Sequence, residues 1–289
     1  MSGFFKWVGI IAGILIALLA VIGGVFFITG KAKVTEARAV TPPLTMVEID
    51  SASVARGAHL AQILSCKVCH GEDFEGTEFL DIPPFRAVAT NLTAGAGGIA
   101  NDYTDADWDR ALRYGVKPNG QAMIVMPSNL FHNLSDADAA AMIAYMKSLP
   151  AKDNDLGETE FRAPLYLMAG APGPNVFPNV IDEDEPRIAV PEIGPTAEYG
   201  AYLTRLACVE CHGQDLRGGT YPEPDAPDGP DLAAAGQWQL AEFAKAMREG
   251  QTPYGTQLQD KYMPWEQSYQ YLDDVEIEAL HKHLATLGS

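Results

Sequence analysis

The longest hydrophobic stretch of the chain lies near its beginning. From Trp7 to Gly30 the sequence reads WVGIIAGILIALLAVIGGVFFITG and contains no charged residue. About 20 apolar residues in a helix are enough to cross the hydrocarbon layer of a bilayer, which is about 30 Å thick. The pattern therefore predicts a transmembrane helix, and we assign residues 1–30 to a membrane anchor.

A cleaved signal peptide is the alternative for this stretch. The apolar part of a signal peptide is usually about 7–15 residues long and is followed by a cleavage site of small residues. The stretch here is longer, and no clear site of that kind follows it, which favours an uncleaved anchor. Lys31, Lys33 and Arg38 follow the stretch and Lys6 precedes it, so the positive charge alone favours a cytoplasmic C-terminal side.

Beyond the anchor, one pattern of apolar and polar residues occurs twice. Each copy has a short helical stretch from Arg56 or Tyr199, then an amphipathic stretch that ends at Gly115 or Gly250, and then a final helix. The apolar residues recur at helical spacing, and a glycine is typical just after the end of a helix. Ser135 with Asp138, and Asp273 with Glu276, resemble the capping pairs that begin helices. We predict an all-α fold with two helical units, residues 51–150 and 196–289.

The remaining segments lack this periodicity. Residues 31–50 carry two prolines and a few charges, and we assign them to a spacer between the membrane and the first unit. Residues 151–195 are rich in proline and acidic residues, which favours an extended connector. Several of its side chains are too apolar for a free linker, so we expect it to pack along one or both units; they are Phe161, Leu165, Tyr166, Leu167, Met168 and Phe177. A fully disordered linker is the alternative.

The charge of the chain is strongly negative and unevenly distributed. The formal net charge is −18, and residues 39–289 alone carry 16 basic and 37 acidic side chains, or −21. We therefore do not expect nucleic acid or anionic lipid headgroups as partners of this part. A protein partner with a basic docking patch would be attracted to it, whereas the alternative is that the acidity serves only solubility.

All four cysteines lie in two copies of one motif, CKVCH at 66–70 and CVECH at 208–212. In a Cys-x-x-Cys-His sequence the two thiols lie about one helical turn apart, and the motif is typical of covalent haem attachment through thioethers. The histidine then faces the iron as an axial ligand. We therefore predict two covalently bound haem c groups, held by Cys66, Cys69 and His70 and by Cys208, Cys211 and His212.

Paired cysteines also occur in other kinds of site. A thioredoxin-like redox centre uses one Cys-x-x-Cys pair, and two pairs can hold zinc through four thiolates. Neither site explains a histidine directly after both pairs. A disulfide framework is typical of short chains with little core, whereas 289 residues leave room for two domains.

The second axial position of each iron needs a further ligand. Each copy has a Met-Pro pair in the loop before its last helix, which places Met126 and Met263 at 56 and 51 residues after His70 and His212. Because the two positions match, we predict that both methionines ligate iron through sulfur. Met123 is the alternative ligand in the first copy, and His132 would instead give a site with two histidines.

The imidazole of a metal-bound histidine usually donates its other N–H to a carbonyl or carboxylate, which fixes the ring. In the second copy we expect the acceptor to be Pro230, within the sequence GPDL. In the first copy Pro83 or Pro84 is the candidate.

The motifs together resemble a known family. With its two CxxCH motifs the chain is similar to membrane-anchored, di-haem members of the class I cytochrome c family. The first copy, with PFRAVATNLT and YTDADWDRALRYGV, resembles the cytochrome c subunits of membrane-bound alcohol and gluconate dehydrogenases, which usually carry three haem motifs. The second copy, with GPDL and YMPW, resembles a generic cytochrome c domain. The resemblance implies that the first and last helices of each unit cross, with Gly57 near Tyr145 and Gly200 near His283.

The resemblance also implies electron transfer and a location. We predict an electron-transfer protein, not an enzyme, that carries single electrons between periplasmic or membrane redox partners, in a respiratory or photosynthetic chain or with a dehydrogenase. The alternatives are a di-haem peroxidase and a fixed electron conduit in a membrane supercomplex. Because the bacterial machinery attaches haem c outside the plasma membrane, we expect a single-pass inner-membrane protein with periplasmic haem units. This expectation overrides the distribution of positive charge, which alone favours a cytoplasmic C-terminal side.

Overall fold

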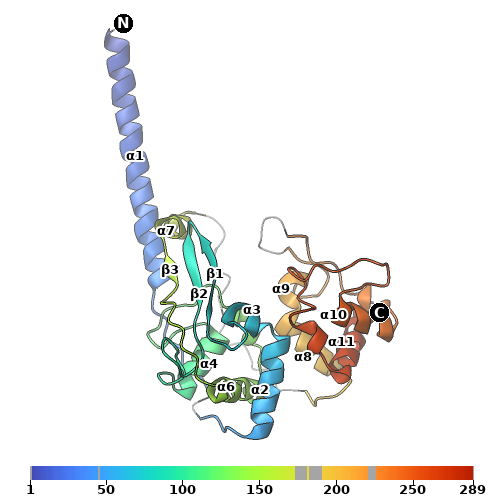
Figure 1. The fold of residues 1–289 in the computed structure, drawn as a ribbon. Helices are drawn as coiled ribbons and strands as arrows, with labels where there is room; N and C mark the ends of the chain where they lie inside the picture. Colours follow the sequence, from blue (N-terminus) through green and yellow to red (C-terminus); the bar gives the residue numbers. More distant parts are fainter. Residues whose placement is uncertain (1, 45, 173–180, 182–190, 221–225, 289) are drawn as a thin grey trace.

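The computed structural model describes residues 2–44, 46–172, 181, 191–220 and 226–288. A long helix, α1 (Ser2–Thr35), stands out from a body formed by two units (Figure 1). It is long and apolar enough to span a membrane, and its apolar side chains are exposed over most of its length. α1 continues five residues beyond the predicted end of the anchor, because no proline or glycine occurs between residues 31 and 35 to end it.

The first unit is built around two crossing helices, α2 and α6. Asp50 begins α2 by accepting the backbone N–H groups of Ala52 and Ser53, both at 2.8 Å. The contact between the two helices is so close that a Cβ on Gly57 would lie 2.0 Å from Ala141 O. The helices of this unit are α2 (Ser51–Ile63), α3 (Cys66–His70), α4 (Asp105–Tyr114), α5 (Ser128–Phe131) and α6 (Asp136–Ser148).

The second unit repeats this crossing with α8 and α11. A Cβ on Gly200 would lie 2.0 Å from Ala279 O. The same hypothetical Cβ atoms lie 2.8 Å from the Cβ of Tyr145 in the first unit and of His283 in the second, which confirms both predicted neighbours. The elements of the second unit are α8 (Ala197–Ala207), α9 (Val209–His212), the 3-10 turn η1 (Ala235–Gln237), α10 (Leu240–Glu249), the 3-10 turn η2 (Tyr269–Tyr271) and α11 (Asp274–Thr286).

Both predicted capping pairs are present at the starts of the last helices. Asp138 N donates to Ser135 Oγ at 3.0 Å, and Glu276 N donates to Asp273 Oδ1 at 2.8 Å. Each bond satisfies one of the backbone N–H groups that a helix leaves free at its N-terminus. Local sequence therefore decides where α6 and α11 begin.

The first unit also contains a small sheet that the sequence did not predict. Strands β1 (Thr77–Ile82) and β2 (Phe85–Ala89) form an antiparallel hairpin, and β3 (Glu160–Phe161) pairs with β2 on its other side. The residues between β1 and β2, Pro83 and Pro84, form the turn of the hairpin. The fold is otherwise helical, so the all-α class holds broadly with this three-stranded addition.

The connector packs along the first unit over residues 151–172. Asn91 Nδ2 donates to Lys152 O at 2.8 Å, and Asn154 Nδ2 donates to Glu75 O at 3.1 Å. The chain then adds β3 to the sheet and forms α7 (Ala163–Gly170) against α1 (Figure 1). A fully disordered linker is therefore wrong for this part. Phe177 lies outside the described residues, as do Pro174, Pro178, Pro186 and the acidic run from Asp182.

The two units share a polar interface with several buried groups. Arg56 on α2 binds both carboxylate oxygens of Asp138 at 2.9 Å, and Tyr202 on α8 donates to the same carboxylate at 2.8 Å. His59 Nε2 lies 2.8 Å from Oε1 of the buried Glu276 on α11. Because removing one partner of a buried charge pair is costly, this network holds the units in one relative orientation.

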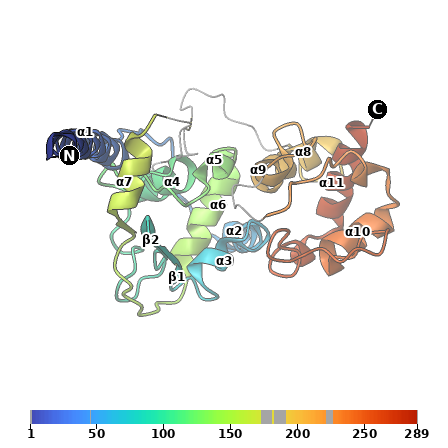
Figure 2. The same cartoon turned by 90° about the horizontal axis from the view of Figure 1, so that it is seen from above.

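The same units share one continuous hydrophobic core. Leu64, Phe131 and Leu134 of the first unit belong to the same buried cluster as Tyr202 and Leu206 of the second. Figure 2 shows α2 and α5 of the first unit facing α8 and α9 of the second. The two units are therefore packed together along this face.

The contact between His59 and Glu276 predicts a dependence of stability on pH. The hydrogen bond to Glu276 raises the pKa of His59 above its usual 6.5, against the opposing effects of burial and of nearby Arg56. A raised pKa means that the added stability is complete below pH 6.5 and is lost as the pH rises through the folded-state value. We expect the difference in thermal midpoint between the native chain and His59→Gln to shrink from pH 5.5 to pH 9. A difference that is constant across this range would contradict the ion pair.

Candidate functional site

The backbone just before the two cysteine motifs differs between the two units. Gly57 lies nine residues before Cys66, whereas Gly200 lies eight residues before Cys208. In the second unit α8 runs on to Ala207 and leads directly into the motif. In the first unit the extra residue, Ser65, adopts a left-handed conformation with φ of 61° between α2 and α3. The one-residue difference therefore becomes a break in the helix just before the first motif.

A cavity of about 790 Å³ lies inside the first unit and includes the first motif. This volume is typical of sites that hold a small molecule or cofactor. Cys66, Cys69 and His70 line one part of its wall, and Met123 and Met126 line another. The rest of the lining is mostly apolar and includes Leu92, Trp108, Phe131, Met142, Ile143 and Met146.

The two motif histidines have matching hydrogen bonds. His70 Nδ1 lies 2.9 Å from Thr90 O, and His212 Nδ1 lies 2.9 Å from Pro230 O. Burial lowers the pKa of both imidazoles, so each is neutral near pH 7 and donates its Nδ1–H to the carbonyl. The lone pair of Nε2 is then available to a metal, which is the arrangement usual for a histidine ligand.

The carbonyl that orients His70 is not one of the predicted prolines. Pro83 and Pro84 are occupied in the β-hairpin turn, and Thr90, directly after β2, supplies the acceptor instead. A prediction from sequence missed Thr90 because it depended on seeing the hairpin. The only signal was spacing, since Thr90 and Pro230 lie 20 and 18 residues after their histidines.

All four motif thiols are partly buried. Burial raises the pKa of Cys66 and of Cys208 to about 12, and the pKa of Cys211 to about 11. Within the described part of the chain, no cluster of potential metal ligands includes these cysteines. A four-cysteine zinc site therefore finds no support.

Met123 has a counterpart in the second unit that is not a methionine. Met123 N donates to Gly115 O at 2.7 Å, and Leu258 N donates to Gly250 O at the same distance. Both bonds close the loop that follows the glycine at the end of a helix, α4 or α10. The repeat therefore matches Met123 with Leu258, whose side chain cannot ligate a metal.

Met126 and Met263 occupy equivalent turns. Ser128 N donates to Met126 O at 2.8 Å, and Trp265 N donates to Met263 O at 2.7 Å. Both methionines are partly buried and pack against the core cluster that also contacts Cys66 and Cys208. The matched geometry favours Met126 over Met123 as the equivalent of Met263.

His132 is placed differently from a ligand of the first site. Its Nδ1 lies 3.1 Å from Arg113 O, and its ring packs edge to face on Tyr114 with the centroids 5.2 Å apart. It does not line the cavity that contains His70. The arrangement with two histidines therefore finds no support in the described residues.

One buried donor in the cavity wall fits an acidic cofactor. Trp108 is 5% exposed, and its Nε1 has no hydrogen-bond partner in the described part of the chain. An unpaired buried N–H is costly, so such a group calls for a partner that a water, an ion or a bound molecule can supply. Haem carries carboxylate groups that accept hydrogen bonds, so Trp108, the two thiols, His70 and Met126 form a donor set that fits it. Sequence reasoning missed Trp108 because an amphipathic helix gives no sign of which indole lacks a partner.

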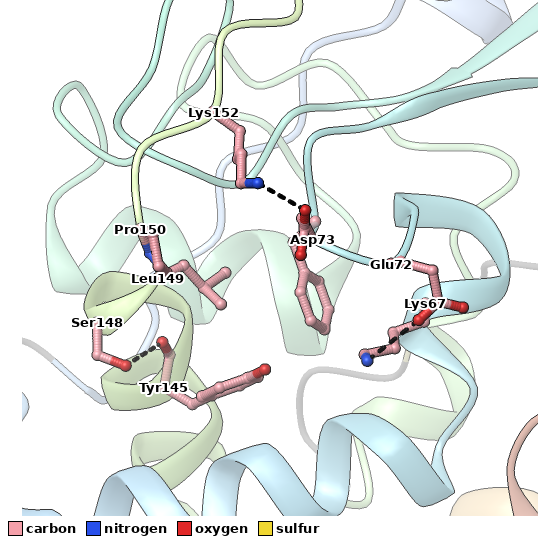
Figure 3. Close-up of a pocket in the computed structure, with 9 residues that line it drawn as sticks. Lys67, Glu72, Asp73, Tyr145, Ser148, Leu149, Pro150 and Lys152 are labelled. Carbon is pink, nitrogen blue, oxygen red and sulfur yellow. Dashed lines mark hydrogen bonds and ion pairs between the residues drawn. The ribbon is translucent and has the colours of Figure 1, made fainter.

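A second, smaller pocket lies outside α3 and differs from this cavity (Figure 3). Its volume is about 290 Å³, and its charged side chains are already paired. Lys152 binds Asp73 at 2.7 Å, and Lys67 binds Glu72 at 3.3 Å. The lining of this pocket includes neither the motif cysteines nor His70, whereas the large cavity includes all three, so the large cavity is the candidate site of the first unit.

Several relatives of the chain are cytochrome subunits of dehydrogenases. The chain is 24% identical to the fructose dehydrogenase cytochrome subunit of Gluconobacter japonicus over 88% of its own length and 56% of the relative. It is 25% identical to the gluconate 2-dehydrogenase cytochrome c subunit of Pantoea cypripedii, over 84% of this chain and 61% of the relative. It is also 25% identical to the cytochrome c subunit of the quinone alcohol dehydrogenase of Gluconacetobacter polyoxogenes, over 83% and 57%. The chain thus spans somewhat more than half the length of these relatives.

The family profile matches both units separately. The profile of cytochrome c covers residues 54–150 and again residues 197–288, which together are well over half of the chain. Each match contains one CxxCH motif, its oriented histidine and one Met-Pro turn. With two such regions on an apolar N-terminal helix, the chain belongs to the cytochrome c family.

Proposed function

We propose that the protein is a membrane-tethered, di-haem electron-transfer subunit, and that it is not itself the catalyst of a substrate reaction. The observation that carries the proposal is the repeated arrangement of a CxxCH histidine whose Nδ1 is hydrogen-bonded to a backbone carbonyl at 2.9 Å in both units. Haem c, when bound, would supply a reversible one-electron change at iron. Cys66, Cys69, Cys208 and Cys211 would hold the two groups covalently, with His70, Met126, His212 and Met263 as axial ligands.

The residues of this chain would prepare both sites in the same way. The carbonyls of Thr90 and Pro230 fix the two imidazole rings, and matching backbone bonds close the turns that carry Met126 and Met263, which would hold iron through sulfur. Rigid ligands limit the reorganisation that accompanies a change in charge at the metal. The mostly apolar lining of the first cavity would surround much of the bound group with apolar side chains.

A short series of contacts joins the two sites. Ser65 directly precedes Cys66, and its Oγ lies 2.7 Å from Oγ of the buried Ser268. Ser268 N donates to Pro264 O at 3.0 Å, and Pro264 directly follows Met263. The left-handed residue that breaks the helix before the first motif thus contacts the loop of the second candidate ligand. These contacts support a fixed conduit between the two sites.

The relatives and the anchor support a proposal for the partners and the location. The relatives are named as cytochrome subunits of fructose, gluconate and alcohol dehydrogenases, so we infer a dehydrogenase or a similar membrane complex as the electron donor. The haem units would lie in the periplasm of a bacterial inner membrane, where haem c is attached. The acidic surface of residues 39–289 would attract a partner with a basic docking patch at low salt.

Haem counting tests this proposal directly. The native chain should carry two haem groups, measured by the mass of the intact chain and by haem absorbance per chain. The double variants Cys66→Ala/Cys69→Ala and Cys208→Ala/Cys211→Ala should each carry one, because each removes both thioethers of one site. A count of one in the native chain, or of two in either variant, would refute the di-haem assignment.

A further inference from the structure

Helix α7 (Ala163–Gly170) is apolar on every side and has no charged residue. One face packs against α1, where Leu165 and Ala169 are buried in a small cluster with Val34. The opposite face leaves Leu167 40% and Met168 52% exposed. Because a helix on a water-facing surface usually has a polar outer face, water alone does not explain this exposed side.

The packing of α7 on α1 is very close. A Cβ on Gly30 would lie 1.8 Å from Tyr166 O, and a Cβ on Gly170 would lie 1.9 Å from Phe26 O. The ring of Tyr166 meets Phe27 edge to face, with the centroids 5.4 Å apart. Glycines that let two backbones approach in this way are typical of helix pairs in membranes. α7 is therefore a fixed part of the anchor.

The contacts with α1 set the depth of α7. The uncharged run of α1 ends at Gly30, and about 20 of its residues span the hydrocarbon layer. The part of α1 that touches α7, residues 26–34, therefore lies at the boundary between hydrocarbon and headgroups. Lys33 Nζ donates to Ala169 O at 3.1 Å, and Tyr166 lies at the same level. Lysine and tyrosine are common at this boundary.

The direction of α7 also fits a membrane surface. In Figure 2, where α1 is seen nearly along its axis, α7 is seen from the side. α7 thus runs across the end of α1, and in a membrane crossed by α1 it would lie roughly in the plane of the surface. Its exposed apolar side continues the exposed apolar surface of α1.

We propose that α7 is a second membrane contact, in which Pro164, Leu167 and Met168 lie in the interfacial layer of the bilayer and touch lipid. α1 alone would leave the first unit free to rotate about the axis of one helix. Two attachment points remove that freedom and fix the direction in which the first candidate site faces. Because α7 carries no basic residue, the contact depends on apolar insertion and not on anionic lipid. The proposal does not depend on the number of bound haems.

Spin labelling of the full chain tests this contact. A nitroxide is attached at Met168→Cys in phosphatidylcholine nanodiscs that hold one chain each, and its collisions with oxygen and with a water-soluble nickel chelate are measured. Ile16→Cys, 68% exposed in the middle of α1, marks the hydrocarbon, and Tyr254→Cys, 79% exposed in the second unit, marks water. Labelling the native chain under the same conditions measures any background from its four cysteines, and haem absorbance reports the fold of each variant.

If α7 touches lipid, the label at position 168 should collide with oxygen more often than the label at position 254 does. It should also collide with the nickel chelate several-fold less often than that label. Its depth should be shallower than that of position 16. Nickel collisions equal to those at position 254 would overturn the proposal. Protection from both oxygen and nickel would also overturn it, because the face would then be covered by protein and not by lipid.

Discussion

Replacing Met263 with histidine is expected to lower the midpoint potential of one haem and leave the other almost unchanged. A thioether ligand favours ferrous iron and raises the potential, whereas a second imidazole does not. Axial ligands shift haem potentials over about 0.8 V, so we expect a fall on the order of 0.2 V. A spectroelectrochemical titration of the purified chain would resolve the two potentials. Two potentials that both stay at their native values would show that Met263 does not ligate iron.

The first site permits a matched comparison of two neighbouring methionines. We expect Met126→Leu to open one site, so that the reduced protein binds carbon monoxide at one haem, whereas Met123→Leu should leave both sites closed. The expectation rests on the repeat, in which Met123 matches Leu258 and Met126 matches Met263 through equivalent backbone bonds. Both methionines line the same cavity, so each variant also controls for the loss of a side chain there. Carbon monoxide binding by the Met123 variant alone would reverse the assignment.

The features that the sequence predicted correctly are those encoded by neighbouring residues. The capping bonds at Ser135 and Asp273 join residues only three positions apart, so the pattern is visible in the sequence. The apolar run of α1 predicts its helix by length and composition alone. The crossings at Gly57 and Gly200 were not visible locally and came from the family resemblance, which the close backbone contacts confirm.

The features that were missed depend on contacts between distant segments. Thr90 orients His70 only because the β-hairpin returns the chain to the motif, and β3 completes that sheet from about 70 residues later. The buried interface that pairs His59 with Glu276 joins residues 217 apart. Periodicity describes which face of a helix is apolar, but it does not show which second segment covers that face. The lone extra residue at Ser65 was visible as an offset between the repeats, and only the structure gives its consequence.

Substituting alanine for Gly57 or for Gly200 is expected to destabilise the unit that contains it more than any surface change. The new Cβ would lie 2.0 Å from Ala141 O in one case and 2.0 Å from Ala279 O in the other, and both obstacles are backbone atoms. Two helix backbones can relieve such a clash only by moving apart, so the loss in the free energy of unfolding should reach or exceed the usual overpacking cost of about 1–3 kcal/mol. Such a loss corresponds to about a 10 °C fall in the melting temperature. Thermal unfolding in detergent, followed by haem absorbance, measures this fall.

Gly194→Ala provides the matched control, because the nearest atom to its new Cβ is 3.8 Å away and its backbone is not left-handed. We expect its melting temperature to differ from that of the native chain by less than about 3 °C, as for most surface changes. The helix α2 that carries Gly57 also carries the interface residues Arg56 and His59. Separation of α2 from α6 would therefore disturb the contact with the second unit as well as the first site. If Gly57→Ala had the same melting temperature as Gly194→Ala, α2 and α6 could not cross as closely as described. The close contact between these helices would then not explain how the two sites keep one relative orientation.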